Sequence, residues 1–134
     1  GKYRHNDDSL VNEFGDDKMA YLRQFCFNIC PENTNAMGYV TEKLFQAIAS
    51  GCIPVYWGSY NRPEPDVLNR DAIVFWNKDG DNADTIRLVK ELVESPQLME
   101  EFLSQPRLLP TAEEYVADSM SRIERKVKET VDNL

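Results

Sequence analysis

The sequence predicts an α/β fold in which helices flank a parallel β-sheet. Residues 25–59 run as an apolar stretch, a polar loop, an amphipathic stretch and a second apolar stretch, which is the strand, loop, helix, strand order of a parallel crossover. A third short apolar run at 72–76 precedes another amphipathic pattern at 84–94. The 134 residues, 42% of them hydrophobic, are enough for one domain with a buried core.

The N-terminal part of the chain is polar. Residues 1–17 are rich in turn-forming side chains, so we expect a loop there. One or two helical turns over 18–23 should follow, with Tyr21 and Leu22 packing inward. The single histidine, His5, lies in this polar stretch, which argues against a histidine-based triad or metal site.

The central elements follow from short apolar runs and their boundaries. Residues 25–30 predict a buried strand, and 31–38 form a polar, turn-rich loop. A helix should follow and end at Gly51, and 52–57 should form a second strand parallel to the first. The apolar side of this helix is expected to carry Val40, Leu44, Phe45 and Ile48.

The remaining elements alternate in the same way. Residues 58–65 contain two prolines and a glycine and therefore form a loop. A short turn of helix at 66–69 should precede the third strand at 72–76. Helices are predicted over 84–94 and 97–104, separated by Pro96.

A long amphipathic helix is predicted from Thr111 onward. Its apolar residues recur every three or four positions, and they are Tyr115, Val116, Met120, Ile123 and Val127. The stripe follows a heptad only approximately. The helix therefore lies across its own domain, covers a further part of the protein, or pairs as a coiled-coil dimer.

Charge and cysteine content exclude several classes of function. The formal net charge of −8 argues against nucleic acid and against electrostatic attachment to an anionic membrane. No apolar run approaches the length of a membrane span. The three cysteines, Cys26, Cys30 and Cys52, fall on the predicted strands, so we expect buried thiols in a reducing compartment and no zinc site.

The start of the central helix has the features of an anion site. Helix N-termini at the carboxyl edge of a parallel sheet present unpaired N–H groups and partial positive charge. Lys43 adds a full charge, Thr41 is a plausible N-cap, and Glu42 can complement the helix dipole or accept hydrogen bonds from ribose hydroxyls. Helix capping and solvation alone explain the same triplet equally well.

Three sequence blocks carry a resemblance to a known family. The blocks are FNICPEN at 27–33, GYVTEK at 38–43 and GCIPVYWGS at 51–59. Together they resemble the signature of the α1,3/1,4-fucosyltransferases, and a looser similarity extends to about residue 107. The resemblance implies the Rossmann-like, donor-binding half of a GT-B glycosyltransferase that transfers fucose from GDP-fucose with inversion. Residues 1–110 would then be the nucleotide-sugar domain and 111–134 the C-terminal helix, packed on that domain or on a missing N-terminal half.

The same resemblance implies roles for five residues. Lys43 would pair with the diphosphate and Glu42 with ribose hydroxyls. Asn33 and Tyr39 would contact the nucleotide or its phosphates, and Glu32 would contact the sugar. From the residues alone, Asn33 is equally a turn residue, Tyr39 a packing aromatic and Glu32 a solvated acid.

The resemblance also implies what this chain does not supply. The catalytic base would lie in the N-terminal half, which would also bind a GlcNAc-containing oligosaccharide acceptor, so we assign no catalytic residue here. No cofactor and no metal would be required. Asp79 and Asp81 match the Asp-x-Asp pattern that holds a divalent cation in another glycosyltransferase architecture, but turn formation and helix capping explain them better. The chain alone should bind GDP-fucose or GDP weakly and transfer nothing.

Two other functions stay open. The chain is alternatively the donor half of a GT-B enzyme that uses another nucleotide sugar, or a non-enzymatic α/β interaction module. By analogy with bacterial relatives we expect the protein in the bacterial cytoplasm, either free or attached peripherally to the inner membrane. The alternative location is the Golgi lumen.

Overall fold

The computed structural model describes residues 7–133. Its sheet has three parallel strands in the order β1 (Phe27–Pro31), β2 (Ile53–Trp57) and β3 (Val74–Phe75). The pairing of β1 with β2 begins at Phe27 and Ile53 and ends at Pro31 and Trp57. The predicted α/β class with a parallel sheet is confirmed.

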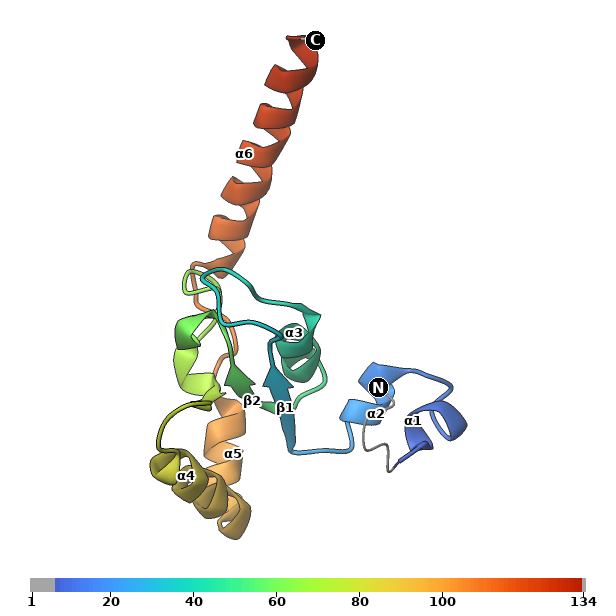
Figure 1. Ribbon diagram of the computed structural model, residues 1–134, viewed down its shortest axis with the longest axis vertical. Helices are drawn as coiled ribbons and strands as arrows, with labels where there is room; N and C mark the ends of the chain where they lie inside the picture. Colours follow the sequence, from blue (N-terminus) through green and yellow to red (C-terminus); the bar gives the residue numbers. More distant parts are fainter. Residues whose placement is uncertain (1–6, 134) are drawn as a thin grey trace.

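The helices of residues 7–133 are α1 (Ser9–Asn12), α2 (Lys18–Leu22), α3 (Glu42–Ala49), α4 (Ala83–Glu94), α5 (Pro96–Ser104) and α6 (Ala112–Asp132), with short 3-10 helices η1 (Ser59–Asn61) and η2 (Arg70–Ala72). Helix α3 lies on one face of this sheet, and α4 and α5 cover part of the other (Figure 1). Helix α3 packs on β1 and β2, and α4 packs on α5. The predicted unit of strand, loop, helix and strand is therefore present as β1, α3 and β2.

The N-terminal part contains more helix than expected. Helix α1 forms inside the segment predicted to be a loop, because the Asp7 carboxylate accepts hydrogen bonds from the backbone N–H of Ser9 at 2.9 Å and from its hydroxyl at 2.6 Å. Asp17 caps α2 by accepting from the N–H of Ala20 at 3.0 Å. Residues 1–6, including His5, lie outside the described residues.

The predicted turn of helix at 66–69 is present only as a single turn, since the N–H groups of Val67 and Leu68 donate to the Glu64 carbonyl at 2.9 Å. Leu68 ends this turn in an antiparallel bridge with Leu108, and the third strand is shorter than 72–76. The Asn69 side chain accepts from the N–H of Asp71 at 3.1 Å and thereby begins η2. Since η2 includes Ala72, the strand starts only at Val74.

The larger part of the core lies between α3 and the sheet, and a second cluster of Ile53, Val74 and Leu92 lies where α4 and α5 pack on the sheet. Leu44 and Ala47 of α3 are fully buried against Cys30 and Tyr56 of the strands. Phe45, expected on the buried side, is 40% exposed. A helix on an open sheet buries a narrow stripe spaced by three or four residues, so Ala47 follows Leu44 in the core in place of Phe45.

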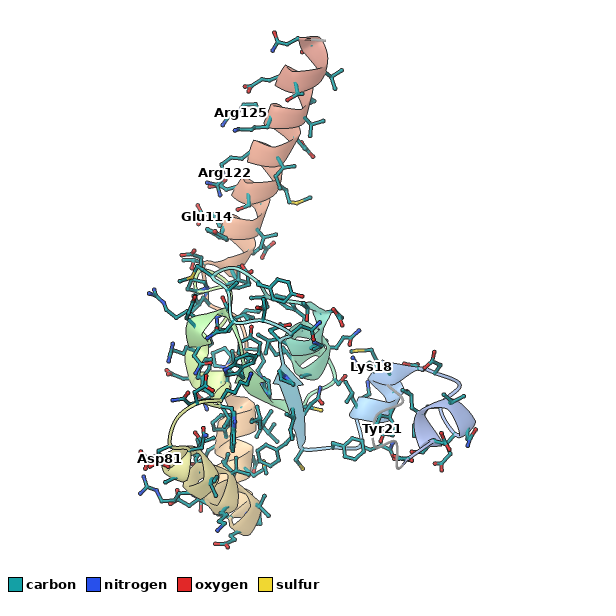
Figure 2. All side chains as sticks on the ribbon, viewed as in Figure 1. Lys18, Tyr21, Asp81, Glu114, Arg122 and Arg125 are labelled. Atoms are coloured by element: carbon teal, nitrogen blue, oxygen red, sulfur yellow. The ribbon has the colours of Figure 1, made fainter. Side chains whose placement is uncertain are left out.

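Helix α6 extends away from the sheet, and the side chains of Glu114, Arg122 and Arg125 stand out along its length (Figure 2). Only Ala112, at its first position, is buried. The apolar stripe of Tyr115, Val116, Met120, Ile123 and Val127 is 39–57% exposed. The helix does not pack on its own domain in this structure, and packing on a second half of the protein stays a prediction.

Two of the three predicted buried thiols are buried. Cys30 and Cys52 are 1% and 0% exposed, whereas Cys26 is exposed. Cys26 lies one residue before β1 begins, and although its carbonyl still accepts from the N–H of Ile53 at 2.7 Å, its side chain is not covered. Of the helices between residues 7 and 133, none combines the length and apolar composition needed to cross a membrane.

Candidate functional site

The candidate site lies where β1 ends and the chain turns toward α3. The backbone N–H of Glu32 donates to the carbonyl of Trp57 at 2.8 Å, which extends the ladder one residue beyond Pro31. The polar loop then returns to Thr41, the residue before α3. The carboxyl edge of β1 and the N-terminus of α3 therefore meet, as the sequence predicts.

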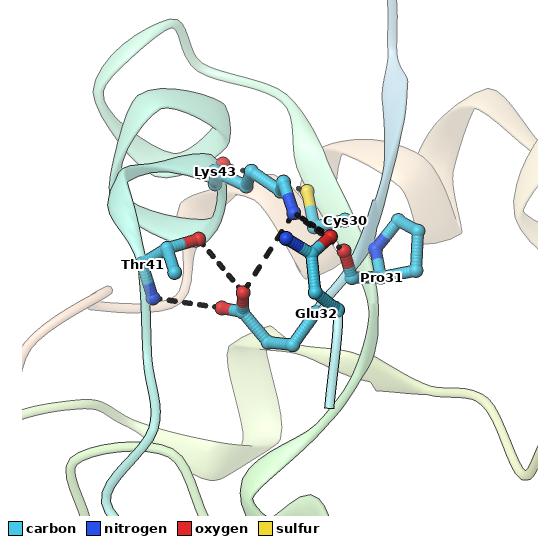
Figure 3. A network of polar contacts seen from close by, with 6 residues as sticks. Cys30, Pro31, Glu32, Thr41 and Lys43 are labelled. Atoms are coloured by element: carbon cyan, nitrogen blue, oxygen red, sulfur yellow. Dashed lines mark hydrogen bonds and ion pairs between the residues drawn. The ribbon is translucent and has the colours of Figure 1, made fainter. Parts of the chain in front are cut away.

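Glu32 is buried at this junction. The residue is 3% exposed and its side chain 0% exposed. Its carboxylate accepts one hydrogen bond from the backbone N–H of Thr41 at 2.8 Å and another from the Thr41 hydroxyl at 2.7 Å (Figure 3). Thr41 occupies the expected N-cap position of α3, but its hydroxyl accepts no hydrogen bond from the helix N–H groups and donates to Glu32.

Lys43 reaches from the first turn of α3 to the same loop. Its Nζ donates to the carbonyl of Pro31 at 3.1 Å and to Oδ1 of Asn33 at 3.3 Å, and it lies 3.9 Å from Oε2 of Glu32 (Figure 3). The Lys43 side chain is 29% exposed. Its ammonium group is therefore held at the edge of the sheet while part of the Lys43 side chain stays exposed.

A buried thiol also packs against the start of α3. The Cys30 thiol has two backbone carbonyls within reach of its single proton, that of Asn28 at 3.3 Å and that of Lys43 at 3.6 Å. Burial raises the pKa of Cys30 to about 12, so the thiol keeps its proton. Cys30 thus has a packing role in β1 rather than a reactive one.

The structure brings three of the five predicted residues together. Glu32, Asn33 and Lys43 are in contact. Tyr39 is 38% exposed, and its backbone N–H donates to Ala36 at 3.0 Å. Glu42 is exposed in the first turn of α3, and among the described residues it has no hydrogen bond or ion pair.

A second loop packs against the first one. The Asn35 side chain accepts from the backbone N–H of Tyr60 at 2.6 Å, and the Ser59 hydroxyl accepts from that of Gly38 at 3.1 Å. Ser59, Tyr60 and Asn61 all have positive φ, at 47°, 50° and 53°, a backbone that side chains disfavour. This contact between the two loops was not predicted from the sequence. The Asn and Ser residues in both turn-rich segments are the feature that could have indicated it, because their side chains often bond to loop backbone.

Gly58 and Tyr56, also missed from the sequence, adjoin the buried carboxylate. A Cβ atom at position 58 would lie 2.5 Å from Cγ of Glu32, and φ there is +148°. Burial, followed by the charge of Glu32, raises the pKa of Tyr56. The Tyr56 hydroxyl lies near Glu32 but forms no hydrogen bond, so it has no partner among the described residues.

An apolar trough of about 770 Å³ lies on the face of the sheet opposite α3. Its walls include Phe27, Ile29, Val55, Trp57, Ile86 and Val89, and it reaches Asn33 at the carboxyl edge. Ile29 is 75% exposed there. Both faces of parallel sheets are normally covered, whereas α4 and α5 cover only part of this face.

The Asp79 and Asp81 segment has the contacts of a turn. The Asp79 N–H donates to Asn77 Oδ1 at 3.3 Å, and Asp81 Oδ1 accepts from the N–H of Ala83 at 2.9 Å, where α4 begins. The turn interpretation is confirmed. In the part of the chain that the structure describes, no group of three or more His, Cys, Asp or Glu residues is placed to hold a metal ion.

Comparisons with known proteins point in one direction. The family model of the glycosyltransferase family 10 (fucosyltransferase) C-terminal region matches residues 4–119. A stretch of 43 residues is 54% identical to the α-(1,3)-fucosyltransferase FucT of Helicobacter pylori and covers 32% of this chain and 9% of that protein.

Solved structures agree with the family match. Two crystal structures of α1,3-fucosyltransferase, one with GDP and one with GDP-fucose, superpose with a TM-score of 0.58 at 32% identity. Each match covers 66% of this chain and 26% of the solved chain. The chain thus spans about a quarter of those solved structures and less of the Helicobacter pylori relative.

Proposed function

The chain belongs to glycosyltransferase family 10, whose C-terminal model matches it over residues 4–119, and on this premise we propose that it binds the donor for fucosyl transfer. The donor is GDP-fucose, and the acceptor is a GlcNAc-containing glycan bound by a further part of the enzyme. The observation that carries the proposal is the Lys43 ammonium, held by Pro31 and Asn33 at the carboxyl edge of β1. Ligands of open parallel sheets bind at this edge.

Lys43 has the central role in this proposal. Transfer from a nucleotide diphosphate sugar builds negative charge on the leaving diphosphate, and fixed positive groups stabilise it. The accessible part of Lys43 would exchange its bond to Asn33 for a phosphate oxygen. The N-terminus of α3 adds partial positive charge at the same place.

The other predicted residues surround this position. Glu42 is exposed in the first turn of α3, where its carboxylate can accept hydrogen bonds from ribose hydroxyls. Tyr39 and Asn33 lie on the loop before α3, where they would contact the nucleotide or its phosphates. Glu32 has no exposed side-chain surface, so a direct contact with the sugar would require its side chain to move.

We further propose that the reaction inverts configuration and needs no metal ion. Lys43 and the α3 N-terminus place positive charge where the leaving group becomes negative, which is the task a metal would otherwise perform. The base that deprotonates the acceptor belongs to a part of the enzyme outside this chain. The free thiols at positions 26, 30 and 52 support a reducing, cytoplasmic setting.

A calorimetric titration of GDP, GDP-fucose, UDP and ADP against the chain and Lys43→Ala tests the proposal. We expect the guanosine nucleotides to bind best and Lys43→Ala to weaken GDP by about tenfold to a hundredfold, since hydrogen bonds to charged groups contribute about 1.5–3 kcal/mol. Lys126→Ala removes the same charge from the exposed face of α6 and should change nothing. EDTA should leave GDP affinity unchanged.

The same titration separates the alternatives. Preference for UDP or ADP would indicate a donor half for another nucleotide sugar. Absence of nucleotide binding, or equal GDP affinity of wild type and Lys43→Ala, would favour an interaction module and refute the donor site. Fucosyl transfer to a lactosamine acceptor by the chain alone would contradict the placement of the catalytic base elsewhere.

A further inference from the structure

Glu32 carries a carboxylate that the protein covers completely beside the proposed donor site. Its side chain is 0% exposed, and an uncompensated buried carboxylate is strongly unfavourable. The compensation comes from one segment, because Thr41 donates both its N–H and its hydroxyl and Lys43 lies 3.9 Å away. Every one of these partners belongs to the start of α3.

The end of β2 is shaped to hold the Glu32 side chain inward. Gly58 leaves the space that Glu32 occupies, since a Cβ there would lie 2.5 Å from Cγ and 2.8 Å from Cβ of Glu32. The unpartnered Tyr56 hydroxyl borders the same space. A solvated loop acid needs no such cradle, so the buried position of Glu32 is a built feature.

The contacts of Glu32 constrain Lys43 from two directions. Through Thr41 the carboxylate holds the residue that begins α3, which sets the path of the Lys43 backbone. Through Oε2 it lies near the ammonium at the other end of the Lys43 side chain. The remaining ammonium partners, Pro31 and Asn33, are the chain neighbours of Glu32.

We propose that Glu32 is the positioning residue of the donor site. Its buried carboxylate fixes the start of α3 and directs the Lys43 ammonium toward the leaving diphosphate without touching the donor. This inference rests on the proposed function. It assigns Glu32 a role different from the sugar contact that the family resemblance implies.

Charge and position have opposite effects on affinity, and this makes the inference testable. A negative charge 3.9 Å from Lys43 lowers the positive potential that a diphosphate experiences. By charge alone, Glu32→Gln would therefore strengthen GDP binding. If Glu32 acts by positioning, the same substitution weakens GDP binding, because Lys43 and the N-terminus of α3 lose their fixed placement.

The experiment measures GDP and guanosine affinity for the full chain and Glu32→Gln. We expect GDP to bind at least about fivefold more weakly, the equivalent of losing roughly 1 kcal/mol of net hydrogen bonding, and guanosine to bind as before. Glu94→Gln, which removes an exposed acid at the end of α4, should leave both affinities unchanged. Unchanged or tighter GDP binding by Glu32→Gln overturns the inference, as does an equal loss for guanosine.

A second pair of variants keeps the test valid if Glu32→Gln fails to fold. Thr41→Val removes the hydroxyl that donates to Glu32, whereas Thr41→Ser keeps it. GDP affinity should fall in Thr41→Val and stay within about twofold of wild type in Thr41→Ser. Equal behaviour of the two variants refutes the positioning role. If the wild-type chain does not bind GDP, both the proposed function and this inference are refuted. If the wild-type chain binds GDP and Glu32→Gln binds it equally well, only the inference is refuted.

Discussion

Replacing Gly58 with alanine tests whether the fold depends on the buried Glu32 carboxylate and on the space that Gly58 leaves for it. The new Cβ would lie 2.5 Å from Cγ of Glu32, 2.8 Å from its Cβ and 2.9 Å from the Tyr56 hydroxyl. Contacts this short do not persist, so the backbone or the Glu32 side chain must move. If Glu32 moves outward, the two hydrogen bonds from Thr41 are lost.

The expected loss of stability has two sources. Gly58 has φ 148° and ψ 174°, a region that glycine almost alone adopts, at a cost of about 1–3 kcal/mol for other residues. Overpacking of a filled interior adds about 1–3 kcal/mol. Gly58→Ala should therefore lower the free energy of unfolding by about 2–6 kcal/mol.

Urea denaturation followed by circular dichroism measures this loss, and Gly38→Ala is the matched control. Gly38 also has positive φ, at +72°, but its added Cβ would meet nothing within 4 Å. Backbone strain alone predicts a loss of about 1 kcal/mol there. A loss at Gly58 no larger than that at Gly38 would refute the tight contact with Glu32.

Two further predictions concern the core and the thiols. Leu44 is 0% exposed, so Leu44→Ala should lower the free energy of unfolding by about 2–5 kcal/mol. Phe45 is 40% exposed, so Phe45→Ala should lower it by only about 1 kcal/mol. Equal losses in urea denaturation would contradict the inward orientation of Leu44. A thiol reagent at about pH 8 should label only Cys26 in the native chain, because Cys30 and Cys52 are buried and the pKa of Cys30 is raised to about 12. In denaturant the reagent should label all three cysteines. Rapid labelling of Cys30 in the native chain would contradict its burial. Since the folded pKa of Cys30 lies above that of an unfolded cysteine, its stabilising contribution is present below about pH 8.5 and is lost as the pH rises toward 12.

The order of elements was predictable because it depends on local patterns. Short apolar runs, the polar loop at 31–38 and Gly51 are enough to place β1, α3 and β2. The errors occur where distant contacts decide the outcome. The turn before η2 ends at Leu68 because Leu68 pairs with the distant Leu108, and Cys26, just before β1, is exposed.

The candidate site was predictable in composition but not in arrangement. The motif placed Asn33 and Lys43 near one another because a strand end and a helix start meet in a parallel crossover. It did not reveal that the Lys43 ammonium contacts Asn33, ten residues earlier in the chain. Nor did it separate the exposed Glu42 from the buried Glu32, since two glutamates have identical intrinsic chemistry.

The sequence by itself determined the fold class, the element order and the family, because periodicity and motif spacing are properties of neighbouring residues. Only the tertiary structure decided which acid is buried, since burial of Glu32 requires Thr41 from α3 and the space left by Gly58 after β2. Those groups come from three segments that meet only once the sheet has formed. A carboxylate can leave water only where such donors converge, and that convergence is a property of the folded chain.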